Sequence, residues 1–178
     1  MRLPHRSLPK KQGLHKTQFF PDGSSYKGYW QNGSFEGNGI FVSQFHRYEG
    51  TFKNNKYHGT GTLYFKNKVL YVGSWENGLY TGSGTLYENQ STYSGEFNSG
   101  KKQGFGILIK ANYSYDGQFF DDKMEGSGTE ITSTQIYKGE FVNNQRHGFA
   151  ELIVGNKLFK GSFFEGHPQM GEWHLVVK

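Results

Sequence analysis

The sequence predicts an all-β protein, an elongated and twisted antiparallel sheet in which β-hairpins stack as a solenoid-like ribbon. Three observations predict this class. Aromatic residues make up 17% of the 178 residues, and aromatic side chains favour strands. Glycine accounts for 26 residues, and glycine is typical of turns. Both recur with a period of 22–23 residues, which is too short for a helical pair and suits one hairpin for each repeat.

A repeated frame begins at an aromatic residue, which we count as position 0. The frame starts at Tyr26, Tyr48, Tyr71, Tyr93, Tyr115, Tyr137 and Phe159. Position 2 is glycine and position 4 is tryptophan or phenylalanine in all seven frames. Position 11 is glycine in six frames and position 13 in five. The chain is therefore predicted to be a repeat array.

The elements are predicted in chain order from this frame. Residues 1–14 form a basic N-terminal arm, and residues 15–25 form a degenerate half-unit. In each later unit the first strand covers positions 0 to 5 and the second covers positions 11 to 16. Positions 6 and 7 are rich in Asn, Asp and Gly, which suit the tight turn of a hairpin. Residues 172–178 form a C-terminal capping strand, because the last frame has Met170 at position 11 and Glu172 at position 13.

The glycines of the frame are expected to leave room for aromatic rings. Positions 0, 2 and 4 of a strand share one face, so a glycine separates two rings there. We expect rings from neighbouring strands to lie over the bare glycines and to form the core. The predicted core residues are Tyr26, Trp30, Tyr48, Phe52, Tyr71, Trp75, Tyr93, Phe97, Tyr115, Phe119, Tyr137 and Phe141.

This frame, from about His15 to Glu172, resembles the MORN repeat, the "membrane occupation and recognition nexus" motif. The resemblance implies a sheet with a shallow groove, and it implies scaffolding and partner binding rather than catalysis. Arrays of this family occur in ciliary radial spoke proteins, junctophilins and parasite cytoskeletal proteins. By this analogy we expect a cytoplasmic component of a cytoskeletal or axonemal assembly.

The face opposite the predicted core carries candidate partner-binding residues. Position 5 is polar in the early units and becomes Phe120, Val142 and Phe164 in the last three. Position 12 carries Phe105 and Phe149. An apolar patch on a polar face indicates a partner, although sheet twist could instead fold these residues into the core. For the apolar residues at position 16 we expect the second outcome, burial in the core.

The basic arm is the second candidate surface. Arg2, Arg6, Lys10, Lys11 and Lys16 carry the net charge of +5, because the remaining basic and acidic residues balance. The arm could bind an acidic protein such as tubulin. Alternatively, the chain is a peripheral membrane adaptor that binds acidic phospholipids or phosphoinositides. A third alternative is that the arm is a solvated tail.

No catalytic, cofactor or metal site is predicted. The chain has no cysteine, and its seven histidines are scattered. The GxG motifs lack the following helix that a phosphate-binding loop needs. The carboxylates do not converge on a pocket, so we expect no enzyme activity. No nucleic-acid binding is expected either, because the aromatic residues are committed to the core and the body lacks a basic stripe.

Overall fold

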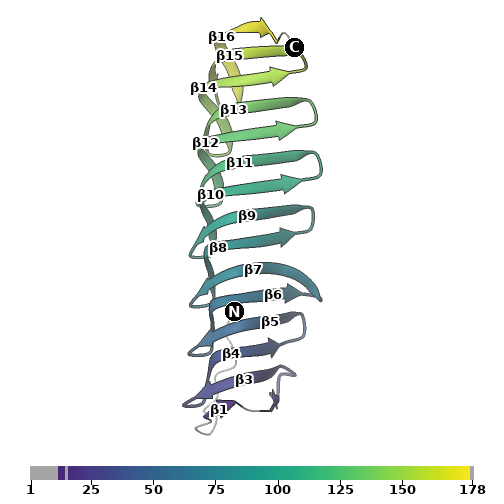
Figure 1. Ribbon diagram of the computed structural model, residues 1–178, viewed down its shortest axis with the longest axis vertical. Coiled ribbons are helices and arrows are strands. Elements are labelled where there is room, and N and C mark those ends of the chain that lie inside the picture. Colours follow the sequence, from purple (N-terminus) through teal and green to yellow (C-terminus); the bar gives the residue numbers. More distant parts are fainter. Residues whose placement is uncertain (1–11, 15, 177–178) are drawn as a thin grey trace. The chain divides into compact units, whose positions relative to one another are not determined.

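The computed structural model describes residues 12–14 and 16–176. These residues form antiparallel strands and no helix, and each hairpin is followed along the chain by the next (Figure 1). The strand order follows the chain, except that β2 pairs with β3 beside β1. The prediction of an all-β sheet of stacked hairpins is confirmed.

The strands belong to two compact units, which we describe separately. The first unit extends to Tyr87 and includes the turn Asn98–Gly100, and the second contains Glu88–Phe97 and the residues from Lys101 onward. The first unit contains β1 (Gly13–Leu14), β2 (Gln18–Phe19), β3 (Ser25–Gln31), β4 (Ser34–Val42), β5 (His46–Lys53), β6 (Lys56–Phe65), β7 (Lys68–Glu76) and nearly all of β8 (Leu79–Glu88). The second contains most of β9 (Ser91–Asn98), then β10 (Lys101–Lys110), β11 (Tyr113–Phe120), β12 (Lys123–Thr132), β13 (Gln135–Val142), β14 (Gln145–Val154), β15 (Lys157–Phe164) and β16 (His167–Leu175).

The second strand of each repeat begins at position 8, three residues before the predicted start. Position 11 lies inside the strand at a β-bulge. In the first repeat Gly28 pairs with Gly39 and Tyr29 pairs with Glu36, so Gly37 and Asn38 are extra residues on β4. The glycines at position 11 have φ between 53° and 83°, a conformation that other residues rarely adopt. Because a bulge bends its strand, these glycines bend each hairpin at the same place.

Tight turns connect the two strands of each repeat. Both turn residues have positive φ in every repeat, as at Asn32 and Gly33 or Asp121 and Asp122. This conformation is typical of the hairpin turns expected from the sequence. The second turn residue also contacts the preceding hairpin: the N–H of Asn144 donates to the carbonyl of Met124 at 3.0 Å, and the N–H of Met124 donates to Asn144 Oδ1 at 2.8 Å.

The core lies on one face of the sheet, which we call the inner face, and the opposite face is the outer face. All twelve predicted core residues are buried, with exposed fractions of 0–4%. Each tyrosine ring lies over the glycine at position 2 of its own strand and over position 13 of the neighbouring strand, so the gap is filled from within the same hairpin. A Cβ added to Gly39, for example, would lie 2.4 Å from Tyr26 Oη.

Within each unit, aromatic contacts link one repeat to the next. The Tyr115 ring meets Phe119 of its own repeat edge to face at 5.2 Å, and it meets Phe141 of the following repeat at 4.9 Å. The Tyr115 hydroxyl also donates to the carbonyl of Gln118 at 2.9 Å, next to the bulge. Each such ring pair adds about 0.5–1.5 kcal/mol beyond the area that it buries. The repeats therefore stabilise one another.

Two predictions about the ends of the array and its outer face need correction. Gly171, not Glu172, takes the role of position 13, because it pairs with Gly161 and a Cβ on it would lie 2.4 Å from the Phe159 ring. The last repeat is therefore one residue shorter at its bulge. The expected burial of position 16 is wrong: Val42, Tyr87, Ile109 and Ile131 are exposed on the outer face, over which the described residues form no second layer.

Candidate functional site

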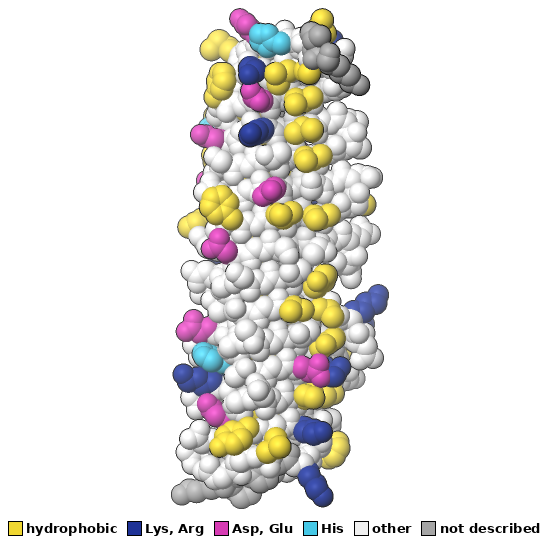
Figure 2. All heavy atoms as spheres, viewed as in Figure 1, with side chains coloured by type: hydrophobic (Ala, Val, Ile, Leu, Met, Phe, Trp, Pro, Cys, Tyr) yellow, Lys and Arg dark blue, Asp and Glu magenta, His cyan; other side chains and the backbone are white. Residues whose placement is uncertain are grey.

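Five apolar residues proposed as partner-binding residues lie on the outer face of the second unit. We call Phe105, Phe120, Val142, Phe149 and Phe164 the phenylalanine surface. Their exposed fractions run from 37% for Val142 to 73% for Phe149, so sheet twist does not fold them into the core. Exposed apolar side chains that gather on one face indicate a binding surface. Figure 2 shows a face of the molecule on which exposed hydrophobic side chains lie beside acidic ones.

The register of the strands arranges four of these rings as two pairs. Phe105 on β10 pairs with Gln118 on β11, and Phe120 lies two residues beyond Gln118 on the same face. Two repeats later, Phe149 on β14 pairs with Ser162 on β15, and Phe164 lies two residues beyond Ser162. Such diagonal neighbours are about 7–8 Å apart, within reach of aromatic side chains. The second unit thus presents the same pair of rings twice.

Acidic residues surround the phenylalanine surface. The hairpin turns and the outer-face positions between the turns and the bulges carry Glu96, Asp121, Asp122, Glu125, Glu140 and Glu165, which we call the acidic margin. The basic residues at these positions in the described second unit are Lys101 and Lys123. Lys101 already forms an ion pair with Asp121 at 3.0 Å. The surface is therefore apolar and negatively charged.

Part of the acidic margin also has a structural role. Glu96 Oε1 accepts a hydrogen bond from the N–H of Phe105 at 3.0 Å, next to the bulge, and Gln118 accepts the equivalent bond from Ser127. Glu125 Oε2 accepts a hydrogen bond from the turn N–H of Asn143 at 2.8 Å. Because a glutamine does the same work one repeat away, the hydrogen bonds at these positions do not require a negative charge.

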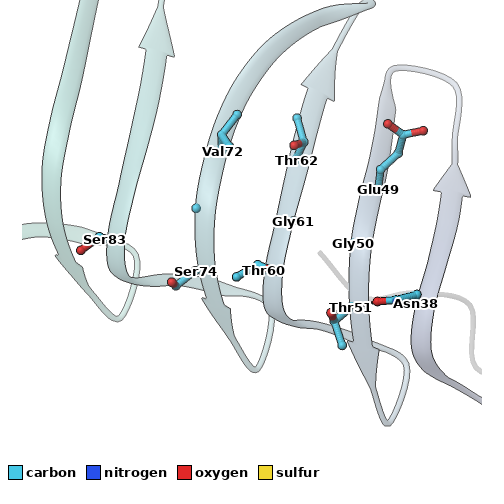
Figure 3. A pocket seen from close by; sticks show the side chains of 11 residues that line it. Asn38, Glu49, Gly50, Thr51, Thr60, Gly61, Thr62, Val72, Ser74 and Ser83 are labelled. Carbon is cyan, nitrogen blue, oxygen red and sulfur yellow. Dashed lines mark hydrogen bonds between the residues drawn. The ribbon is translucent and has the colours of Figure 1, made fainter.

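The same positions differ in the first unit. There the outer face is hollowed over a volume of about 530 Å³, whose lining includes Asn38, Thr51, Thr60, Ser74 and Ser83. Figure 3 shows these short polar side chains on neighbouring strands. Position 5 carries Gln31, Lys53 and Glu76 instead of apolar residues. At positions 5 and 12 the large apolar side chains are thus confined to the second unit, whereas Tyr29 and Val42 are exposed apolar residues of the first.

A set of inner-face residues at position 9 was missed by the sequence analysis. In the first unit Phe35, Tyr57 and Tyr80 stack on the tyrosine at position 0 of their repeat at 3.8–3.9 Å. In the second unit the position carries Lys102, Met124 and Arg146. The guanidinium of Arg146 lies 4.8 Å from the centre of the Tyr137 ring and forms a largely buried ion pair with Glu130 at 2.7 Å. The sequence signal that could have revealed this role is the aromatic residue two positions after the turn in each repeat of the first unit.

Burial on this face changes the ionisation of the tyrosines. It raises the pKa of Tyr71, Tyr93 and Tyr137 to about 12, from an ordinary value near 10. The phenol groups therefore remain neutral hydrogen-bond donors at physiological pH. Such groups support the sheet rather than proton transfer.

The predicted basic arm falls mostly outside the described residues. Arg2, Arg6, Lys10 and Lys11 lie there, and Lys16 is exposed at the start of the first unit. The arm as a binding element therefore stays a prediction.

The described residues offer no arrangement typical of a metal or phosphate site. They contain no group of three His, Asp or Glu residues that could hold a metal ion. The GxG motifs lie in strands, where the glycine at position 11 forms a bulge instead of opening a helix. Within the described ranges there is also no helix that is long and apolar enough to cross a membrane.

Comparison with known families supports the repeat frame. A family model described as the MORN repeat matches six segments that together cover more than half of the chain: residues 26–44, 48–68, 71–92, 93–114, 115–134 and 137–153. Each matched segment starts at position 0 of one of the first six repeats, and the shortened seventh repeat lies beyond them. No curated protein matches the sequence.

Proposed function

The chain belongs to the MORN repeat family, and we propose that it is a non-catalytic scaffold that docks partner proteins in a cytoskeletal or ciliary, axonemal assembly. MORN repeats are in general modules for protein or membrane interaction, and a binding role fits that family. The assembly is a proposal by analogy with the structural proteins in which such arrays occur.

The observation that carries this proposal is the phenylalanine surface. Rings such as Phe149 and Phe105 are 73% and 63% exposed, although the same protein buries its core rings almost completely. Aromatic side chains are enriched in the buried centre of protein–protein interfaces. Positions 5 and 12 carry large apolar residues in the second unit and polar residues in the first, and a partner explains this difference better than the needs of the sheet.

Site-specific photo-cross-linking in ciliated cells tests this proposal. A photoreactive amino acid replaces Phe120 or Phe149 in the tagged full chain, and in the control it replaces Thr60 or Ser83 of the first unit. We expect protein cross-links from the second unit only, and we expect the tagged chain in the axonemal fraction. Equal cross-linking from both units, or a chain absent from that fraction, would overturn the proposal.

A peripheral membrane adaptor is the second candidate, because the first sixteen residues contain five basic residues and no acidic one. Each basic residue near an anionic lipid surface contributes about 1 kcal/mol. Sedimentation with phosphoinositide vesicles separates the candidates, using the full chain and a variant without residues 1–16. Strong sedimentation that persists without the arm would favour the membrane role, and no sedimentation of either protein would exclude it.

A further inference from the structure

We infer that the phenylalanine surface binds an amphipathic, basic helix of a partner protein, with apolar residues that contact the two ring pairs and Lys or Arg residues that contact the acidic margin. This inference rests on the proposed function and specifies the chemistry of the partner. It concerns the outer face of the second unit alone.

Charge complementarity determines which sign of charge the partner segment should carry. Among the described outer-face and turn positions of this surface, six residues are acidic and two are basic, and one of the basic residues is already paired with Asp121. The corresponding positions of the first unit carry Glu36, Glu76, Lys53 and Lys56, which balance. A basic segment would therefore be attracted to the second unit in preference to the first.

The apolar part of the surface determines how the contacts are spaced. Phe105 lies on β10 and Phe149 on β14, four strands away. At a strand spacing of ~4.8 Å, the two ring pairs are about 19 Å apart. A helix rises ~1.5 Å for each residue and has ~3.6 residues per turn, so apolar residues about 11 or 14 positions apart share one face and lie about 16 or 21 Å apart, close to the spacing of the two ring pairs.

The backbone of the sheet favours a helix over an extended peptide. Strands β10 to β15 are each paired on both sides, so their backbone groups are already hydrogen-bonded within the sheet. An extended peptide crossing them would find side chains only and would lose the solvation of its own backbone groups. A helix satisfies its backbone internally and can contact the surface through side chains alone.

The test uses a fluorescent synthetic helix and the full-length protein. The probe carries two leucine pairs about 11 to 14 residues apart on one helix face and lysines along both sides of the leucine stripe. One control peptide has glutamate in place of lysine, and another has serine in place of leucine. We expect binding of the first peptide only, measured by fluorescence anisotropy, and we expect this binding to weaken as the salt concentration rises.

Two sets of protein variants locate the binding site. Phe120→Ser and Phe164→Ser are each expected to weaken binding by about tenfold, the loss typical of a central apolar contact. Tyr29→Ser and Val42→Ser remove exposed residues of the first unit and are expected to leave binding unchanged. Circular dichroism verifies that each variant is folded.

The triple variant Glu96→Gln, Glu125→Gln and Glu140→Gln removes charge from the acidic margin. Gln103 and Gln118 occupy equivalent positions and accept equivalent backbone hydrogen bonds, so the fold should be retained. We expect about tenfold weaker binding and a smaller dependence on salt.

Every other outcome contradicts the inference. If neither the Phe→Ser nor the Glu→Gln substitutions weaken binding, the peptide binds elsewhere on the protein. If the glutamate peptide binds as tightly as the lysine peptide, the acidic margin does not select a basic partner. Self-association of the protein that is lost in Phe120→Ser would assign the surface to a second copy instead. If the peptide fails while photo-cross-links from Phe120 persist, the inference falls and the scaffold function stands; if both fail, both fall.

Discussion

Gly117 and Gly128 face each other across β11 and β12, and a Cβ added to Gly117 would lie 2.6 Å from the Cα of Gly128 and 2.6 Å from Tyr115 Oη. The two glycines and the tyrosine thus fill one space completely. Because position 2 is glycine in all seven frames, this packing limits what every repeat can tolerate.

We predict that Gly117→Ala is more destabilising than Gly128→Ala. The first methyl group would meet backbone, so strands must separate, and overpacking of this kind costs about 1–3 kcal/mol. The second should be milder, because the sixth repeat already has Ala150 at the equivalent position while Tyr137 keeps its 2.9 Å hydrogen bond to Glu140. Urea unfolding measures both. Equal losses, or a larger loss for Gly128→Ala, would contradict this account.

The turn residue Asn144 provides a second prediction. Asn144→Gly removes the side-chain acceptor of the Met124 N–H but keeps the positive φ, and it should cost about 0.5–1.5 kcal/mol. Asn144→Ala loses the same bond and also places an alanine at a φ of 68°, which adds about 1–2 kcal/mol. Thermal and urea unfolding should therefore rank wild type, glycine and alanine in that order. Gly33 and Gly78 at the same position support the tolerance of glycine.

The ion pair between Arg146 and Glu130 allows a test by double-mutant cycle. Both side chains are largely buried, so either Arg146→Tyr or Glu130→Leu alone leaves an unpaired charge and should cost about 3 kcal/mol. The double variant places Tyr and Leu where the third repeat has Tyr80 and the repeat before it has Leu63. We expect its free energy of unfolding to return near the wild-type value or to exceed it. A double variant with the summed loss of the two single variants would show that the sites do not interact.

The sequence frame predicted the buried rings, the turns and the glycine gaps, because these depend on spacing within one repeat. It placed the start of the second strand too late, because Gly37 and its equivalents were interpreted as strand residues whereas they form a bulge within a longer strand. Positions 8 to 10 were therefore left out of the predicted strand. The ring-stacking role of Phe35, Tyr57 and Tyr80 at position 9 was missed for this reason. Position 16 was misjudged because hydropathy does not show whether a second layer covers a sheet.

The candidate surface was predicted as five residues without their arrangement. The pairing of Phe105 with Phe120, and of Phe149 with Phe164, follows from the register across two strands, which sequence spacing alone does not give. The acidic margin was also missed, since residues such as Glu96 and Glu125 lie beside these rings only because of the bulges and turns.

Alkaline pH should unfold the protein through its buried tyrosines. The pKa of Tyr137 is raised by burial to about 12, and Tyr71 and Tyr93 reach the same value. Above pH 10 the unfolded chain releases these protons while the folded protein retains them. By linkage, stability is fully present below pH 10 and falls as pH rises toward 12.

Urea unfolding across this interval, together with the ultraviolet absorbance of tyrosinate, measures the effect. We expect the urea midpoint of unfolding to decline above pH 10. We also expect a group of tyrosines to ionise together as the circular dichroism signal of the sheet is lost. In Tyr137→Phe the decline should be shallower, because one fewer proton is released on unfolding. Phe159 shows that the frame accepts this residue at position 0, so the variant should fold. Ionisation of all tyrosines near pH 10, with the sheet intact, would mean that the rings do not seal the inner face.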